Sequence, residues 1–373
     1  MLDVALKLLK EINSHSYKAY IVGGFVRDYL LGIESKDIDI TTNATPKQLK
    51  EIFEDSCLPN EEYGSVIIEK NGVRFEITTF RKEIEYDNNR RPVEIKYIDD
   101  LETDLIRRDF IINTICMDSD GNIIDLLDGR TDLDNKLIRT VGNASSKFLE
   151  DSLRILRAIR FATILDFDLD LELKEAILEH KHLIKNLSYQ RKKSELDKIF
   201  TSSNRRKGIE LLLELEIDKE LEIPNLSLVL NTNVSSSIGV WSILDVKDLY
   251  PFNKNEMELI EDINNALNLN NMDPMSLYKY GLYVNSVAGN IKGQDIKNIT
   301  ESYNALVIKS RDEIDIDSFG IMNLLHKSPG KYLKDIYDDI EREILYRRLK
   351  NSREMIENYI INKYKGVDLE WKK

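Results

Sequence analysis

Two hydrophobic patterns divide the chain. Between residues 18 and 141, short apolar runs alternate with turn signals, and four of them predict β-strands: KAYIVGG, DIDITTNA, GSVIIEK and VRFEITTF. The pair Asn71-Gly72 between the last two runs predicts a β-hairpin. From about residue 147 the apolar positions recur at helical spacing, as in Phe148, Leu153 and Leu156, so the remainder is predicted to be mostly helical.

Breaks in these patterns indicate domain boundaries. The best helix breaks are Pro224, the polar run NTNVSSSIG and the run NLNNMDPMS. We predict a catalytic head over 1–141, a neck over 142–200, a helical body over 201–272 and a helical tail over 273–373. The first twenty residues, MLDVALKLLKEINSHSYKAY, predict an amphipathic helix and not a signal peptide, because charged residues interrupt the apolar positions.

The composition favours a folded protein of several domains. The chain has 373 residues, of which 42% are hydrophobic and 32% are charged. No run of about 18 apolar residues occurs, so no membrane span is expected. The two cysteines, Cys57 and Cys116, are far apart and form no CxxC pair, which argues against a zinc or disulfide framework. We expect a cytoplasmic protein.

The charge balance is unfavourable for a nucleic-acid partner. The net charge is −13, whereas affinity for RNA comes largely from Lys and Arg that neutralise phosphates. The basic residues are clustered, however, as in Arg107-Arg108, Arg191-Lys192-Lys193 and Arg205-Arg206-Lys207. Each cluster alone is also consistent with a solvated face, so an RNA-binding track requires a fold that gathers them on one side.

Asp37 and Asp39 form the first candidate site. Residues two apart in a strand point to the same face, so the two carboxylates lie side by side while Ile38 and Ile40 point into the core. Magnesium is usually held by one or two carboxylates together with substrate phosphates, and two such ions can clamp a phosphoryl displacement. An edge strand with two solvated acids has the same pattern, so the pair alone does not decide.

A glycine turn precedes these acids. The strand that ends at Val22 runs into Gly23-Gly24 and then into a helical segment, FVRDYLLG. Glycines at such a turn let backbone N–H groups approach a phosphate, and the helix start adds partial positive charge. Arg27, on the first helical turn, is placed to reach the same phosphates.

The glycine turn and the acids together match the first motif of a known family. Gly23, Gly24, Arg27, Asp28, Asp37 and Asp39 resemble that motif in the polymerase-β-like nucleotidyltransferases, in particular the class II CCA-adding enzymes (tRNA nucleotidyltransferases) and the bacterial poly(A) polymerases. The resemblance implies an α+β fold, in which a polymerase-β-like head with a mixed sheet is followed by all-helical neck, body and tail domains. It also implies that Asp37 and Asp39 are catalytic and hold two Mg²⁺ ions. Glu76 is a candidate third acid, although a cross-strand partner for Lys or Arg fits it equally.

Further runs extend the resemblance. DLIRRDFIINTICMD resembles the second motif, which implies that Arg108 contacts the nucleotide phosphates and that Asp109 and Asn113 brace that site. DGRTDL, from Asp128, resembles the third motif and implies a stiff joint after the head. SYQRKKSEL resembles a fifth motif, in which Arg191 and Glu195 remain and imply a bracing role in the neck.

The strongest signal is EDSLRILRAIRFATILDF. On a continuous helix, Asp151 and Arg154 are three residues apart and face the same way. The resemblance implies that this pair replaces a template and hydrogen-bonds to the incoming cytosine or adenine, and that Arg157 and Arg160 help to bind the nucleotide. Without the other motifs, the same run is also consistent with a surface ion pair between Asp151 and Arg154, which adds little to the stability of a fold.

Two runs discriminate between members of the family. Poly(A) polymerases usually carry a basic strand signature such as GRRFRLAHV, where this chain has GVRFEITTF, which favours a tRNA nucleotidyltransferase. The run YDNNRRP, from Tyr86 to Pro92, matches in length the flexible loop that enzymes adding only cytidine lack. Full addition of C, C and A from CTP and ATP to the 3′ end of tRNA is therefore expected. The alternatives are adenosine-only addition, poly(A) synthesis, and a non-catalytic RNA-binding protein on the same fold.

Overall fold

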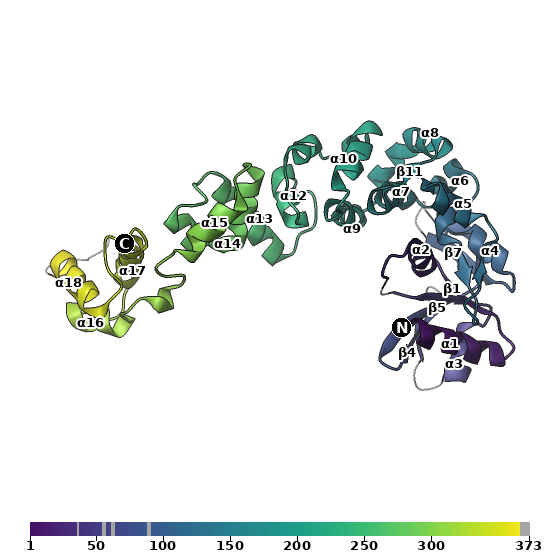
Figure 1. Ribbon diagram of the computed structural model, residues 1–373, viewed down its shortest axis with the longest axis horizontal. Coiled ribbons are helices and arrows are strands. Elements are labelled where there is room, and N and C mark those ends of the chain that lie inside the picture. The colour runs from purple at the N-terminus through teal and green to yellow at the C-terminus, as the bar shows by residue number, and fades with distance from the viewer. Residues whose placement is uncertain (36, 54–56, 61–63, 88–90, 366–373) are drawn as a thin grey trace. The chain divides into compact units, whose positions relative to one another are not determined.

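The chain forms two compact units, Met1–Ser227 and Leu228–Lys373 (Figure 1). The computed structural model describes residues 1–35, 37–53, 57–60, 64–87 and 91–365. Among these described residues, no helix is both long and apolar enough to cross a membrane. The division into head, neck, body and tail at residues 141, 200 and 272 stays a prediction.

A seven-stranded mixed sheet forms the head of the first unit. Its strand order is β3-β4-β5-β2-β1-β8-β9, and β2 pairs with β5 in parallel whereas the other neighbours are antiparallel. The strands are β1 (Ala19–Val22), β2 (Asp39–Thr42), β3 (Cys57–Asn60), β4 (Ser65–Lys70), β5 (Val73–Thr79), β8 (Cys116–Met117) and β9 (Ile123–Ile124). The four predicted strands are confirmed, and β2 occupies the middle of the sheet.

Local sequence explains this sheet. Ile38 and Ile40 are buried, at 3% and 1% exposure, as the alternation predicts. The hairpin between β4 and β5 is confirmed: Asn71 and Gly72 both adopt positive φ, at 55° and 73°, the left-handed conformation that a tight hairpin requires. Because Ile40 fixes one face of β2 in the core, Asp39 and Thr41 are directed to the other face.

A separate hairpin follows the sheet. Strands β6 (Arg81–Asp87) and β7 (Arg91–Tyr97) pair antiparallel, with register irregularities near Glu83 and Glu85. The loop predicted over Tyr86–Pro92 falls at the tip of this hairpin, and residues 88–90 lie outside the described residues.

Helices pack on the head sheet and continue beyond it. The predicted amphipathic helix is confirmed as α1, which buries Ala5, Leu8, Leu9 and Ile12. In Figure 1, α1 and α3 lie on one side of β1 and β5, and α2 lies on the other. The head helices are α1 (Leu2–Ser14), α2 (Gly24–Leu31), α3 (Pro46–Phe53), α4 (Leu101–Ile106), the 3-10 turn η3 (Ile111–Asn113) and α5 (Gly129–Asp134).

The rest of the first unit is helical except for one short strand pair. Strands β10 (Leu137–Ile138) and β11 (Asp168–Leu169) pair in parallel and tie the end of the head to the segment after α7. The helices are α6 (Ala144–Glu150), α7 (Leu153–Leu165), α8 (Leu171–His180), η4 (Lys181–Asn186), α9 (Tyr189–Phe200), α10 (Arg205–Glu214) and α11 (Ile217–Leu221), and η5 (Leu226–Asn231) spans the division between the units.

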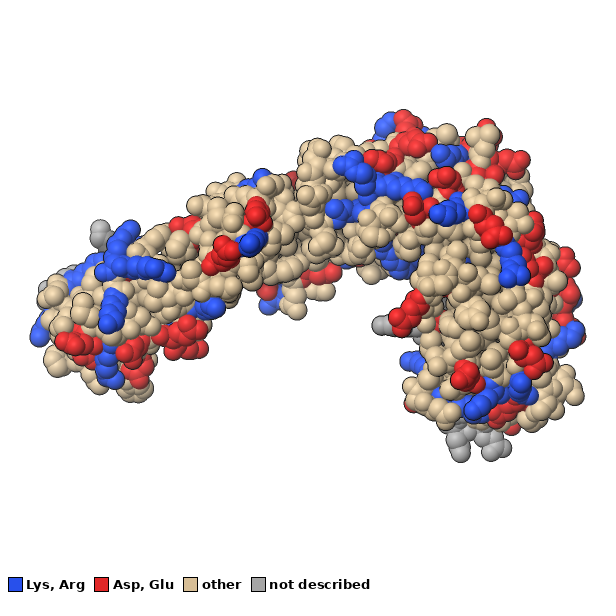
Figure 2. Space-filling model, viewed as in Figure 1, with Lys and Arg blue, Asp and Glu red and all other residues tan. Residues whose placement is uncertain are grey.

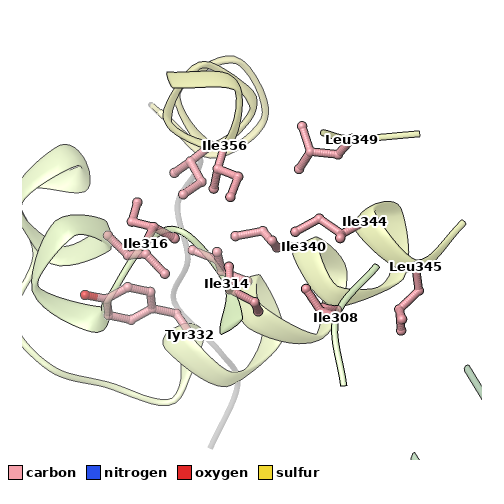
Figure 3. Packing of buried hydrophobic residues seen from close by; sticks show 12 residues of the cluster. Ile308, Ile314, Ile316, Tyr332, Ile340, Ile344, Leu345, Leu349 and Ile356 are labelled. Carbon is pink, nitrogen blue, oxygen red and sulfur yellow. The ribbon is translucent and has the colours of Figure 1, made fainter. Parts of the chain in front are cut away.

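The described part of the second unit is helical throughout. Its elements are α12 (Ser237–Leu244), α13 (Lys254–Leu267), α14 (Pro274–Ile291), α15 (Ile296–Asn304), η6 (Arg311–Glu313), α16 (Ser318–Leu325), α17 (Tyr332–Leu345) and α18 (Arg353–Tyr364). Figure 3 shows its C-terminal core, where Ile340 and Ile344 of α17 point toward Ile356 of α18. Trp241 and Tyr250 are also buried, with ring centroids 4.8 Å apart, so these two aromatics form core and not an exposed stacking platform.

Candidate active site

Two carboxylates, Asp39 and Glu76, are paired in register where β2 begins, and a third, Asp37, lies close by in the sequence. Asp39 is the first residue of β2, and its register partner on β5 is Glu76. Asp37 lies two residues upstream and is exposed, as is Asp39. The strand that carries Glu76 is therefore adjacent to the strand that carries Asp39. Ser65 on β4 donates a hydrogen bond from its hydroxyl to Glu76 Oε1 at 3.0 Å, which orients that carboxylate.

The electrostatics of Asp39 favour a cation. Burial raises the pKa of Asp39, the nearby Arg108 lowers it, and the negative charges of Glu76 and Asp37 raise it further, so the net shift is upward. Among the described residues, no three His, Cys, Asp or Glu side chains are grouped so as to hold a metal by themselves. Two carboxylates with substrate oxygens completing the shell are the donor set that Mg²⁺ commonly uses, so these residues fit that ion.

The glycine turn lies directly beside Asp39. Gly23 follows β1, whose last residue Val22 is the register partner of Asp39, and Gly24 begins α2. Gly23 has φ 81°, and a Cβ built on it would lie 3.6 Å from Arg108 Nη1 and 3.9 Å from Asp39 Oδ2. The predicted strand-to-helix turn is thus confirmed, and its backbone approaches both an acid and an arginine of the site.

A cavity of about 290 Å³ opens next to these groups. Its lining combines two acids with three arginines: Val22, Asp39, Ile40, Ser65, Glu76, Thr78, Arg81, Arg107 and Arg108. Burial and the adjacent Arg107 lower the pKa of Arg108, while Asp104 opposes that shift. The Nε of Arg108 is buried and has no hydrogen-bond partner within the described part of the chain. A cavity with carboxylates at one side and guanidinium groups at another suits a metal-bound phosphate.

Asp109 and Asn113 belong to a polar chain behind the cavity. Arg157 Nε donates to Asp109 Oδ2 at 2.8 Å, Asn113 Nδ2 donates to Asp109 Oδ1 at 3.1 Å, and Arg27 Nη1 donates to Asn113 Oδ1 at 2.8 Å. Burial raises the pKa of Asp109, but the charge of Arg157 and the hydrogen bonds outweigh it and lower that pKa to about 2. The bracing predicted for Asp109 and Asn113 is geometrically reasonable because their hydrogen bonds connect α2, η3 and α7.

Arg27 lies in this chain and is largely withdrawn from solvent. It is 7% exposed, and its guanidinium also donates to Asp28 at 2.8 Å and lies 5.1 Å from the Phe161 ring centroid. Its contact with nucleotide phosphates stays a prediction, while its contacts here brace α2 against α7.

The expected single helix through Asp151 and Arg154 is wrong. Asp151 is the C-cap of α6, with extended φ −147° and ψ 108°, and α7 begins only at Leu153. The backbone breaks because Asp151 Oδ1 accepts from the N–H of Leu153 at 3.0 Å, a local bond that competes with the helix. The two side chains therefore do not form an i,i+3 pair, and their role in base selection stays a prediction.

Asp151 and Arg154 are instead held by other partners. Arg191 on α9 donates to both oxygens of Asp151, at 3.2 and 3.0 Å. Arg154 is 8% exposed and donates to the carbonyls of Lys147 at 3.0 Å and Arg107 at 3.2 Å, in addition to Glu150. Through the Arg107 carbonyl, Arg154 is one hydrogen bond from a residue that lines the cavity.

Arg157 and Arg160 both pair with acids inside the unit. Arg157 binds Asp109, and Arg160 Nε lies 2.6 Å from Glu195 Oε2 on α9, with Glu195 5% exposed. Thus Arg191 and Glu195, the two residues of SYQRKKSEL that match the fifth motif, contact α7 or the residues just before it. Their predicted bracing role agrees with these contacts, whereas nucleotide binding by Arg157 and Arg160 stays a prediction.

The DGRTDL run packs tightly at the end of the head. Gly129 begins α5, where a Cβ would lie 2.7 Å from Ile115 Cγ1 and 2.9 Å from the Ile111 carbonyl oxygen. Asp132, 1% exposed, accepts from Arg139 Nε at 2.7 Å, next to β10. Both contacts hold α5 against η3 and the strand pair, as a stiff joint requires.

The basic residues divide into those that contact acids or carbonyls inside the first unit and those at its surface. Arg107, Arg108, Arg154, Arg157 and Arg160 lie near acids or carbonyls within the first unit, whereas Figure 2 shows Lys and Arg gathered on the surface over α9 and α10. Acidic residues lie among the basic ones over much of the same face (Figure 2). On α10, Arg206 pairs with Glu210 and Lys207 pairs with Asp166 and Asp168, and Lys192 and Lys193 of α9 are buried.

Sequence reasoning missed several residues around the cavity. Ser65, Thr78, Arg81 and Arg107 line it but were not predicted as site residues. A fifth, Asp104, is fully buried and contacts Arg107 and Arg108. The sequence does indicate these contacts, because Asp104 is three residues before Arg107 and four before Arg108, and residues at those spacings are neighbours on a helix.

Comparisons with known proteins agree with this architecture. Residues 19–139 match the family described as Poly A polymerase head domain. The CCA-adding enzyme of Ligilactobacillus salivarius (strain UCC118) is 33% identical over 383 residues, which covers 95% of each chain. The CCA-adding enzyme of Lactococcus lactis subsp. cremoris (strain MG1363) is 36% identical over 375 residues, covering 94% of this chain and 93% of the relative.

Solved structures show the same fold. The Bacillus stearothermophilus CCA-adding enzyme in complex with CTP superposes with a TM-score of 0.86 and 26% identity, and 96% of each chain is covered. The Thermotoga maritima CCA-adding enzyme complexed with tRNA has a TM-score of 0.67 at 21% identity, covering 97% of this chain and 94% of that chain, and it shares the fold.

The mixed sheet, the acid pair and the glycine turn define a polymerase-β-like nucleotidyltransferase. The two CCA-adding enzymes above are 33% and 36% identical to this chain over nearly its whole length. The chain therefore belongs to the family of CCA-adding enzymes.

Proposed function

We propose that the protein adds C, C and A to the 3′ end of tRNA from CTP and ATP, without a nucleic-acid template. The observation that carries the proposal is the in-register pair of Asp39 and Glu76 beside the Gly23 turn, in a chain that matches CCA-adding enzymes along nearly its whole length. The Bacillus stearothermophilus relative was solved with CTP, which supports CTP as one substrate.

In the proposed reaction, the terminal hydroxyl of the tRNA attacks the α-phosphate of the nucleotide. The new bond joins that oxygen to phosphorus, the hydroxyl proton is lost to water, the bond from the α-phosphorus to the bridging oxygen breaks, and pyrophosphate leaves. Asp37 and Asp39 would hold two Mg²⁺ ions, with Glu76 beside them. When bound, these ions supply Lewis-acid stabilisation of the charge that develops on the attacking and leaving oxygens.

The remaining residues bind and orient the substrates. Arg108, with its buried Nε, would bind the triphosphate together with the backbone of Gly23 and Gly24. Asp151 and Arg154 would select the base. Arg191 orients Asp151, and the carbonyls of Lys147 and Arg107 orient Arg154. We place the protein in the cytoplasm, where tRNA and both nucleotides are available.

A labelling experiment tests the function. The protein is incubated with Mg²⁺, labelled CTP or ATP, and tRNA that ends before C, after one C, or after CC. Stepwise incorporation of C, C and then A is the expected result, and a chelator should abolish it. Label from ATP alone on tRNA ending in CC indicates an adenosine-only enzyme, long adenosine tails indicate a poly(A) polymerase, and no label indicates an RNA-binding protein.

A further inference from the structure

Asp104 is a buried acid that the proposed mechanism does not use. It lies in α4 and is 0% exposed, and three of the residues that contact it, Arg81, Arg107 and Arg108, line the cavity. A buried carboxylate persists only where charges and hydrogen bonds compensate for its loss of water. The identity of its partners is therefore informative.

Each oxygen of Asp104 has two partners. Oδ1 accepts from the backbone N–H of Arg81 at 3.1 Å and from Arg107 Nε at 2.8 Å. Oδ2 accepts from Thr41 Oγ1 at 3.3 Å and lies 3.6 Å from Arg108 Nη2. A single carboxylate thus contacts both arginines of the RR pair.

The other two partners connect this carboxylate to the rest of the site. Thr41 is in β2, two residues after Asp39, and it is fully buried. Arg81 is the first residue of β6, so its backbone marks the base of the β6–β7 hairpin. Asp104 therefore contacts the strand that carries the acids, the hairpin base and the cavity arginines at one point.

The arginine pair needs such a counter-charge. Arg107 and Arg108 have side-chain exposures of only 16% and 18%, and two partly buried guanidinium groups repel each other. A fixed carboxylate between them offsets this repulsion and limits their rotamers before the substrate arrives. Such preorganisation strengthens binding because less ordering remains to be done on association.

We propose that Asp104 is a positioning residue, which holds Arg107 and Arg108 toward the triphosphate of the incoming nucleotide. The inference rests on the proposed function, which assigns Arg108 to the triphosphate, and it extends that assignment to Arg107. Because the triphosphate is common to CTP and ATP, the effect of Asp104 on the two nucleotides should be equal.

Asp104→Asn is the test variant, because it keeps the shape of the side chain and removes its charge. Glu102→Gln is the matched control, since Glu102 is an exposed acid on the same helix. We expect Asp104→Asn to raise KM for CTP and for ATP by roughly tenfold or more, by the same factor, with KM for tRNA unchanged. Glu102→Gln should behave as wild type.

Three outcomes overturn the inference. A lower Tm with unchanged nucleotide KM means that Asp104 only stabilises the fold. A change for one nucleotide alone means that it affects base selection. A matching rise in KM for tRNA means a general distortion of the site.

Two checks keep these results interpretable. If Asp104→Asn does not fold, Asp104→Glu replaces it: the charge stays but moves by one methylene, so a raised nucleotide KM is again required and an unchanged one overturns the inference. Failure of the wild-type protein to incorporate either nucleotide contradicts the proposed function itself, whereas normal wild-type activity with an unaffected variant contradicts only the role of Asp104.

Discussion

Asp39 on β2 and Glu76 on β5 face each other as register partners on parallel strands, although they are far apart in the sequence. Burial raises the pKa of Asp39, Arg108 lowers it, and the negative charges of Glu76 and Asp37 raise it further. A cluster of like charges costs stability unless a cation binds there. Functional sites commonly accept such a cost.

Asp39→Ala should abolish nucleotide incorporation without unfolding the protein. Removal of a metal ligand should lower kcat by roughly a thousandfold or more, about 4 kcal/mol in the activation free energy. Tm should be unchanged or slightly higher, because one of three neighbouring acids is gone. Incorporation of labelled CTP and a thermal melt measure both quantities, and normal turnover would refute the metal assignment.

Gly23→Ala and Gly32→Ala form a matched pair. Both glycines have positive φ, but Gly32 is in the left-handed helical region (φ 68°, ψ 23°) whereas Gly23 is not (φ 81°, ψ −136°), so alanine should cost roughly 1 kcal/mol of folding free energy at Gly32 and roughly 2 to 3 kcal/mol at Gly23. No atom of the described residues lies within 4 Å of a Cβ at Gly32, whereas a Cβ at Gly23 faces Arg108 and Asp39. Only Gly23→Ala should therefore lower kcat/KM. Equal activity losses in the two variants would argue against a special role for the Gly23 turn.

Glu195→Gln should destabilise the first unit. It leaves Arg160, whose side chain is 11% exposed, without its nearby counter-charge, at a cost of roughly 3 to 5 kcal/mol. Urea unfolding measures this difference. Glu210→Gln is the control, because Glu210 pairs with Arg206 at the surface, with side chains 54% and 69% exposed. An equally small effect in both variants would show that the Arg160 pair does not stabilise the packing of α7 on α9.

Asp109 should make stability depend on pH in acid. Its folded pKa of about 2 lies below the ordinary value of 3.8, so its contribution is complete above about pH 4 and is lost as the pH falls toward 2. The shift corresponds to roughly 2 kcal/mol of unfolding free energy. Asp109→Asn should be less stable near neutrality and should lose less stability between about pH 4 and 2.

Urea unfolding at a series of pH values tests this expectation. Asp134→Asn is a suitable control, since Asp134 is exposed at the end of α5. A pH dependence that is the same in Asp109→Asn and in wild type would contradict the assignment of the shift to Asp109.

Features set by nearby residues could be predicted from the sequence. The Asn71-Gly72 hairpin depends on backbone preferences of two residues, and the Gly23 turn depends on a strand followed at once by a helix. The burial of Ile38 and Ile40 follows from strand alternation. Each of these predictions needs information from only a few consecutive positions.

Features set by distant partners could not be predicted in this way. The break at Asp151 accompanies its bonds to Arg191, forty residues later, and helical periodicity carries no trace of them. Asp104 likewise contacts Thr41 and Arg81, which lie on other elements. Its spacing to Arg107 was visible, but its burial depends on the packed sheet.

The Asp109–Arg157 ion pair has a consequence for recombination between related genes. It joins Asp109, just before η3, to Arg157 of α7. A second bond across the same boundary runs from Lys147 Nζ to the Ile106 carbonyl, at 2.9 Å. A chimaera joined near residue 141 would inherit each partner from a different parent. Such hybrids should tolerate the junction only when both parents carry compatible partners, so these two segments are expected to be exchanged together.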